Sequence, residues 1–137
     1  MEQEAKGSDR VTIEASVHAL YKQLTLHPQQ HPETSPFLYM KDVFMWAVAR
    51  GVKEGKRQPL SGSREQIFRW DQFSQGTDIP VLKAIALAET GDAEVLLRVD
   101  EILRIAEEYA NAGIHEIKQE IVDQPGEALW NLVALLK

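Results

Sequence analysis

Apolar side chains recur at steps of three and four along much of this chain, which is the spacing of one face of an α-helix. This spacing predicts a first helix from about Thr12, carried by Ile13, Val17, Leu20, Tyr21 and Leu24. Residues 26–36 break the pattern with three prolines. We therefore expect an irregular connection there.

A second helix is predicted around the apolar run 43–49, which reads Val-Phe-Met-Trp-Ala-Val-Ala. A helix that is apolar on every side has to be buried, so this element should lie at the centre of the core. Asp42 is placed to cap or charge its start, and Gly51 is predicted to end it. The glycines and proline that follow indicate a loop over residues 52–63.

The segment after this loop supports two interpretations. Ser63 to Gln66 has the form of a capping box, which favours a short helix over residues 67–73. Its apolar residues are also typical of strands. A short β-pairing with residues 58–60 is therefore the alternative.

The clearest helix boundaries lie in the C-terminal half. Asp78 and Pro80 predict a helix start, and Gly91 predicts its end. Spaced apolar residues further on predict a shorter helix around residues 114–121 and a last helix over residues 129–136.

The longest helix is predicted over residues 93–112, with Asp92 as its cap and Gly113 at its end. Its apolar positions Val95, Val99, Ile102, Ala106 and Tyr109 alternate steps of four and three, as in a heptad seam. Packing inside the core is the favoured use of this seam. A homo-oligomer formed through helix 93–112 is the alternative.

Together these elements predict a mainly α fold. We expect a compact single-domain bundle of about six helices over residues 11–137, with at most one short β-pairing near residues 57–70. Residues 1–10 are polar and are predicted to form a disordered tail. A chain of 137 residues is long enough to bury a core of its own as one domain.

Composition narrows the possible chemistry. The chain has no cysteine, which excludes disulfides, thiolate catalysis and iron–sulfur clusters and fits a reducing compartment. The N-terminus has no apolar stretch that would indicate export, and no apolar run approaches the roughly 20 residues of a membrane helix. We therefore expect a soluble, cytoplasmic protein without contact to a membrane.

Charge is distributed unevenly along the chain. The net charge is −6, but residues 41–70 carry seven basic and three acidic side chains, and residues 71–137 carry five and thirteen. The basic segment surrounds two aromatic residues, Phe68 and Trp70. Its candidate contact residues are Arg50, Lys53, Lys56, Arg57, Arg64, Arg69 and Trp70.

Three interpretations of this basic cluster are open. Cations beside aromatic rings suit a protein interface and also suit contact with DNA phosphates and bases. Protein contact is favoured over DNA because the acidic C-terminal segment would repel a polyanion. In the third interpretation Phe68 and Trp70 belong to the core and the basic side chains are only solvated.

Other motifs do not complete a catalytic pattern. Residues 51–57 lack the spacing of a phosphate-binding loop, and His115-Glu116 lacks the second histidine of a zinc-protease helix. Glu116 and Lys118 have the acid-x-lysine spacing of metal-dependent nucleases, but they fall in a helical pattern that separates their side chains. This remains an unlikely alternative. We expect no catalytic residue, cofactor or metal.

The pattern of helix stops, caps and buried aromatic residues between about residues 36 and 125 resembles a known family, the dnd system-associated protein four of bacterial DNA phosphorothioation systems. The resemblance rests on Pro36-Phe37, Lys41-Asp-Val-Phe-Met45, Ala49-Arg-Gly51, Arg57-Gln-Pro-Leu60, Ile67-Phe-Arg-Trp70, Ala84-Ile-Ala-Leu-Ala-Glu-Thr-Gly-Asp92 and Ile105-Ala-Glu-Glu-Tyr-Ala-Asn-Ala-Gly113.

This resemblance implies a bacterial accessory role in the sulfur modification of DNA or in the linked restriction. Sulfur relay passes through thiols or clusters, so a chain without cysteine cannot carry the sulfur itself. The expected function is therefore non-enzymatic contact with proteins of the modification or restriction system. The resemblance carries no catalytic residues over to this sequence.

Overall fold

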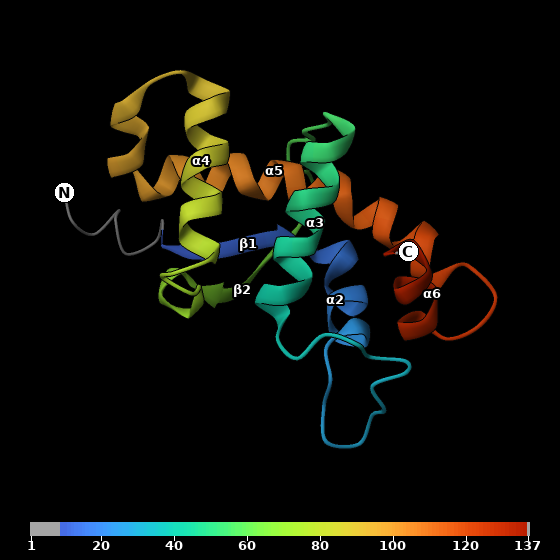
Figure 1. Cartoon of the computed structure of the whole chain (residues 1–137). Helices are drawn as coiled ribbons and strands as arrows, with labels where there is room; N and C mark the ends of the chain where they lie inside the picture. The colour runs from blue at the N-terminus through green and yellow to red at the C-terminus, as the bar shows by residue number, and fades with distance from the viewer. Residues whose placement is uncertain (1–8, 137) are drawn as a thin grey trace.

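The computed structural model describes residues 9–136 and is mainly α-helical, as predicted (Figure 1). Its described part contains five α-helices and one two-stranded antiparallel sheet, which agrees with the expected bundle of about six helices and one short β-pairing. The helices are α2 (His18–Leu24), α3 (Met40–Glu54), α4 (Asp78–Thr90), α5 (Val99–Ile117) and α6 (Ala128–Leu135). The strands are β1 (Arg10–Glu14) and β2 (Arg64–Arg69). None of the described helices combines the length and the apolar character needed to cross a membrane.

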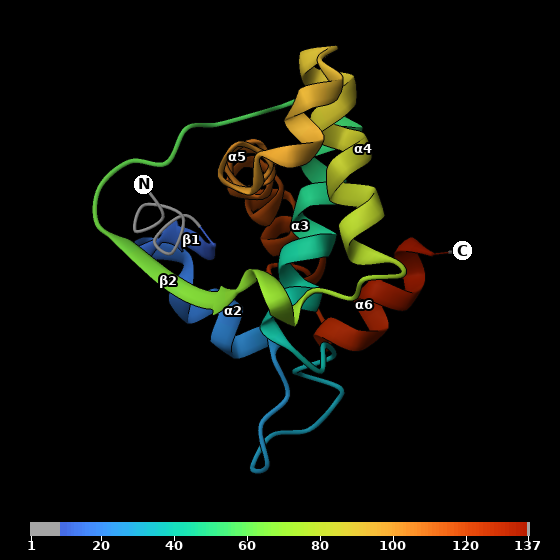
Figure 2. The same cartoon turned by 90° about the vertical axis from the view of Figure 1, so that its left-hand side faces the viewer.

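The crossing of α3 and α5 forms the centre of the molecule (Figure 1). α5 is seen end-on in Figure 2, with α3 and α4 beside it. Side chains from both crossing helices are fully buried, including Phe44, Val48, Ile105 and Ile114. The prediction that the apolar run 43–49 lies in the core is therefore confirmed for most of its residues.

Two glycines that were predicted to end helices instead lie inside them. α3 continues past Gly51 to Glu54 and ends at Gly55, which has a φ of 68°. α5 likewise continues through Gly113 to Ile117, so the separate helix predicted around residues 114–121 does not exist. Both glycines lie at the α3–α5 crossing, where a side chain would collide with the other helix. They serve close packing, which local sequence does not distinguish from a helix stop.

The helix predicted from about Thr12 was wrong for its first residues, because residues 10–14 form β1. Val11 and Ile13 alternate with more exposed neighbours and are buried, which is the two-residue period of a strand. A single 3₁₀ turn, η1 (Ala15–Val17), then leads into α2. Of the tail predicted at residues 1–10, Arg10 belongs to β1, and residues 1–8 lie outside the described residues.

The capping-box helix predicted after Ser63 is absent, because residues 64–69 form β2. The strand alternative was correct, but its partner is β1 and not residues 58–60. The register shifts between Val11 and Thr12, leaving Ile67 as an extra residue, and both Ile67 and Phe68 pack against the core. The helical prediction survives only as one 3₁₀ turn, η2 (Trp70–Gln72).

The helix predicted over residues 93–112 is divided at Arg98. Asp92 does cap a turn, since its side chain accepts a hydrogen bond from the Glu94 N–H, but that turn is the 3₁₀ segment η3 (Ala93–Leu97). α5 then begins at Val99. The seam residues Val95, Ile102 and Ala106 are buried within this one chain, in accord with core packing.

The remaining elements follow the predictions more closely. α4 has Pro80 in its first turn and ends at Gly91 in a left-handed conformation, as expected. α6 matches the predicted last helix. Between α5 and α6 lies a π-helical turn, η4 (Lys118–Val122). Single π turns interrupt helices and are frequent at functional sites.

Candidate interaction groove

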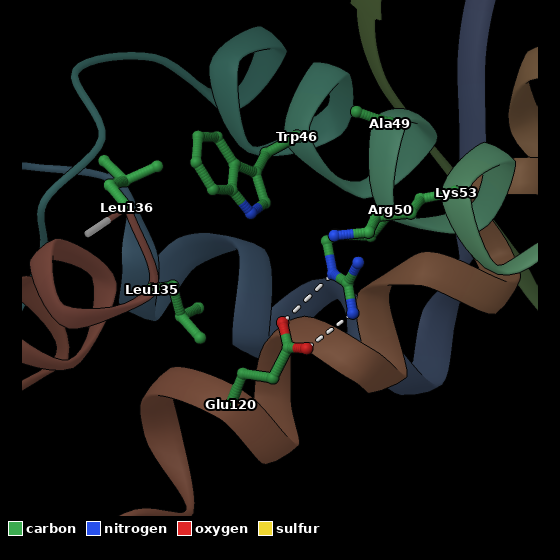
Figure 3. Close-up of a pocket in the computed structure, with 7 residues that line it drawn as sticks. All are labelled: Trp46, Ala49, Arg50, Lys53, Glu120, Leu135 and Leu136. Atoms are coloured by element: carbon green, nitrogen blue, oxygen red, sulfur yellow. Dashed lines mark hydrogen bonds and ion pairs between the residues drawn. The ribbon is translucent and has the colours of Figure 1, made fainter.

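A groove opens where α3, the π turn and the end of α6 meet (Figure 3). It has a volume of about 280 Å³. We call it the α3–α6 groove, and its lining residues are Trp46, Ala49, Arg50, Lys53, Glu120, Leu135 and Leu136. The lining is therefore partly apolar, with an indole ring and two leucines, and partly charged.

An ion pair joins two walls of the α3–α6 groove. The Nε of Arg50 donates a hydrogen bond of 3.0 Å to Glu120, and the Nη2 of Arg50 donates a second bond to the same carboxylate. Figure 3 shows this two-pronged contact between α3 and the π turn. Arg50 also contacts Glu54, one helical turn further along α3. A planar guanidinium that bonds both oxygens of a carboxylate fixes the relative position of the two elements.

Trp46 brings an unused donor to the groove. Its Nε1 is buried and has no hydrogen-bond partner within residues 9–136. Its ring packs against Phe37, with ring centroids 6.0 Å apart. In Figure 3 the indole nitrogen points into the space between α3 and the end of α6. An indole N–H can only donate, so only an acceptor atom can satisfy it.

α6 presents apolar side chains to solvent. Trp130, Leu135 and Leu136 are 56%, 45% and 66% exposed, and Val133 is also exposed. The helix is held at its base, where Asn131 donates a hydrogen bond to the Ile121 carbonyl and the Leu129 N–H bonds the Glu33 carbonyl. Large apolar side chains gathered on one exposed helix are typical of a surface that binds another molecule.

The structure separates the basic residues that the sequence grouped together. Arg50 and Lys53 line the groove, whereas Arg57 lies in the region where the chain leaves α3. Arg57 donates two hydrogen bonds to Glu108, of 3.1 and 2.8 Å, and pairs with Glu89 at 3.2 Å. Its guanidinium also lies over the Tyr109 ring, 5.8 Å from the centroid. Its charge is therefore directed towards α4 and α5.

The other members of the cluster lie elsewhere. Lys56 is largely exposed and lies 3.7 Å from Glu116. Arg64 bonds the Leu60 carbonyl, and Arg69 pairs with Asp71. Trp70 is half-buried and packs edge-on against Phe73, which also contacts Phe68. The two aromatic residues thus belong to the edge of the core, as the third interpretation proposed.

A buried polar connection was not found from the sequence. The Glu14 carboxylate accepts hydrogen bonds from the Ser61 N–H and the Asn111 side chain, at 2.9 and 3.0 Å. Asn111 also donates to the Gln58 and Pro59 carbonyls. Although burial opposes ionisation, these donors hold the pKa of Glu14 below its usual range. Together these hydrogen bonds connect the loop before β2 to both β1 and α5.

Glu107 has the opposite environment. Burial raises the pKa of this carboxyl to about 7, although the Thr12 N–H donates a 2.8 Å hydrogen bond to it. This side chain of α5 faces β1, and it was not among the candidate site residues predicted from the sequence. The pattern of buried and exposed positions along α5 does not predict the burial of Glu107, because β1 covers this side chain.

The structure does not assemble the other candidate chemistry. Glu116 pairs with Lys56, and Lys118 bonds Asp123, so the two nuclease candidates have different partners. Over residues 9–136, no group of three or more histidine, aspartate or glutamate side chains is placed to hold a metal ion.

The fold and the groove define a small, mainly α-helical protein with a partly apolar groove on its surface. A family model described as DNA sulphur modification system-associated protein 4 matches residues 10–137. The chain belongs to this family, and the predicted resemblance is confirmed. The family is associated with a DNA sulphur modification system, as its description states. Comparison with curated proteins and with solved structures gives no significant match.

Proposed function

We propose that this protein is a non-enzymatic contact subunit of a bacterial DNA sulphur modification or linked restriction system. It acts in the cytoplasm and binds another protein of the system through the α3–α6 groove. Its family membership supports the link to the system. Its lack of cysteine supports a role outside the transfer of sulfur.

One observation carries the choice of protein contact. The α3–α6 groove combines the exposed Leu135 and Leu136 with the N–H of Trp46, which has no acceptor in the described part of the chain. Aromatic and apolar anchors around a small number of fixed polar groups are characteristic of protein interfaces. The basic residues favoured from the sequence contribute through Arg50 and Lys53, which lie in the same groove.

The test is co-purification with each modification and restriction subunit encoded in the same system. Each subunit is expressed with a tag, and the extract is treated with nuclease. Wild type is compared with Leu135→Asp, which places a charge at the groove. Leu97→Asp is the matched control, because Leu97 is 86% exposed on η3 and lies outside the groove.

We expect one subunit to retain wild type and Leu97→Asp but to lose Leu135→Asp. Loss of a buried apolar anchor typically weakens binding by about 2 kcal/mol or more. Recovery of no subunit, or equal recovery of all three forms, would reject the proposal. Recovery that disappears with nuclease treatment would identify DNA as the tether.

Direct contact with DNA is the second candidate function. Arg10 and Arg69 face each other across the β1–β2 pair and are exposed, with Arg64 at the other end of β2. Like charges opposite each other on a sheet are unfavourable, and the exposed pair of Arg69 with Asp71 at 3.6 Å offsets this repulsion only in part. Arg50 and Arg57 support this candidate less, since carboxylates already neutralise them.

DNA contact predicts affinity that falls steeply with salt and weakens uniformly across sequences in Arg64→Ala and Arg69→Ala. The measurement is fluorescence anisotropy with a labelled duplex at several salt concentrations. Lys83→Ala on α4 is the control for a general change of charge. Absence of binding, or binding that does not depend on salt, removes this candidate.

A further inference from the structure

The α3–α6 groove has room for one anchoring side chain. Its volume of about 280 Å³ is at the lower end of the roughly 300–1,000 Å³ of pockets that enclose a drug-sized ligand. Leu135 and Leu136 form one wall, and Ala49 leaves room on the opposite wall, on α3. A leucine- or phenylalanine-sized side chain entering from outside would replace water against these apolar surfaces.

The groove also contains a hydrogen-bond donor that needs an acceptor. Leaving a buried donor unsatisfied costs about 1–3 kcal/mol, and the Trp46 N–H has no acceptor within the described chain. Packing against Phe37 restrains the ring from one side. Because the chain's own atoms cover this nitrogen, a carbonyl oxygen beside the entering side chain would reach it only when the groove opens around the indole.

The charge at the rim of the groove favours a partner with a negative charge at this point. Arg50 is engaged by Glu120 and Glu54 and serves to hold the groove together. Lys53 lines the same groove and has no ion pair with any residue between positions 9 and 136. It is therefore the cation that a carboxylate on the partner would meet.

From these three features we propose that the groove binds a short segment of a partner protein carrying a large apolar side chain next to an aspartate or glutamate. The apolar side chain enters between Ala49 and Leu135, a carbonyl oxygen accepts from Trp46, and the carboxylate pairs with Lys53. This inference rests on the proposed function and specifies the partner chemistry of the same site.

The experiment uses overlapping synthetic peptides that cover the subunit recovered in the co-purification. Each carries a fluorescent label, and binding to the full chain is followed by anisotropy. The variants are Lys53→Glu, which reverses the rim charge, and Trp46→Phe, which keeps an aromatic ring but removes the donor. Lys56→Glu is the matched control, since Lys56 is 61% exposed and lies outside the groove.

We expect the binding peptides to share an apolar residue beside an acidic one. Lys53→Glu should weaken them about tenfold, and Trp46→Phe about three- to tenfold, while Lys56→Glu changes little. A peptide whose acidic residue is replaced by lysine should recover affinity for Lys53→Glu. Because Lys53 is on the surface, this charge exchange stays informative even where Trp46→Phe fails to fold.

Two results would overturn the inference while leaving the proposed function intact. One is peptides that bind Lys53→Glu and Trp46→Phe as tightly as wild type. The other is a concentration-dependent dimer in sedimentation that Leu135→Asp converts to monomer, which would make a second copy the occupant. Failure to recover any subunit in the first place would instead reject the proposed function.

Discussion

Gly113 of α5 lies directly against the Ala47 carbonyl of α3. A Cβ atom built on Gly113 would be 1.8 Å from that oxygen and 2.7 Å from the Gly51 backbone nitrogen. A Cβ on Gly51 would similarly be 2.1 Å from the Tyr109 carbonyl oxygen. The two central helices therefore touch through their backbones, and no side chain can be inserted between them.

We expect Gly113→Ala to destabilise the protein by about 3 kcal/mol or more, because the added methyl group forces the two backbones apart. Urea unfolding followed by circular dichroism measures the difference. Gly76→Ala is the control, since Gly76 has ordinary φ and nothing within 4 Å of its built Cβ. Equal stability of the two variants would contradict the close crossing.

Glu14→Gln should lower the free energy of unfolding by about 1–3 kcal/mol near neutral pH, because the ionised carboxylate accepts from Ser61 and Asn111. The native pKa of Glu14 is depressed, so this stabilisation is present above the unfolded value of about 4.3 and disappears as the pH falls through the native value. The difference in free energy of unfolding between wild type and variant should therefore disappear at acidic pH. Glu94→Gln, at an exposed ion pair, should show almost no gap at any pH.

Glu107→Gln should alter the pH dependence in the opposite sense. Because the native pKa of Glu107 is about 7, the folded protein holds a proton that the unfolded chain releases between about pH 4.3 and 7. The release of this proton lowers the free energy of unfolding of wild type as the pH rises through this range. The variant has no carboxyl group at this position and does not show this decrease. The variant should gain at most about 3 kcal/mol relative to wild type between pH 5 and 8. Parallel stability profiles would show that Glu107 titrates normally.

Arg57→Ala is expected to destabilise the fold by about 1–2 kcal/mol, because it removes charged hydrogen bonds to Glu108 and leaves that carboxylate without its strongest partner. Lys56→Ala should change stability by less than about 0.5 kcal/mol, since its contact with Glu116 is long and exposed. Thermal unfolding of both variants checks this. An unchanged melting temperature for Arg57→Ala would return Arg57 to the candidate contact residues.

The comparison of α4 with β2 explains which elements can be predicted from sequence. α4 is bounded by Pro80 and Gly91, whose effects act within one helical turn, and its prediction was correct. Ser63 to Gln66 carries an equally clear local signal for a helix, yet pairing with residues 10–14 overrides it. Local preferences are weak, so a distant strand partner can reverse them.

The candidate site shows the same limit. Arg50 to Arg69 are close in sequence and alike in charge, but their partners Glu120, Glu108 and Glu89 come from the acidic half of the chain. The basic segment and the acidic segment of the chain therefore form ion pairs with each other. Trp46 was recognised only as part of a buried run, because the sequence does not reveal that its N–H meets no acceptor among residues 9–136.

From the sequence alone we could predict the mainly α class, the central place of the run 43–49, the absence of thiol chemistry and the family. These properties depend on composition and on spacings of a few residues, which can be read along the chain. The three-dimensional structure was needed to show that Gly51 and Gly113 are contact points, that Glu14 meets Asn111, and that α3 and α6 enclose a groove. Those features depend on contacts between residues that are far apart in the chain. The contacts contribute to stability only after the core has formed and brought these residues together.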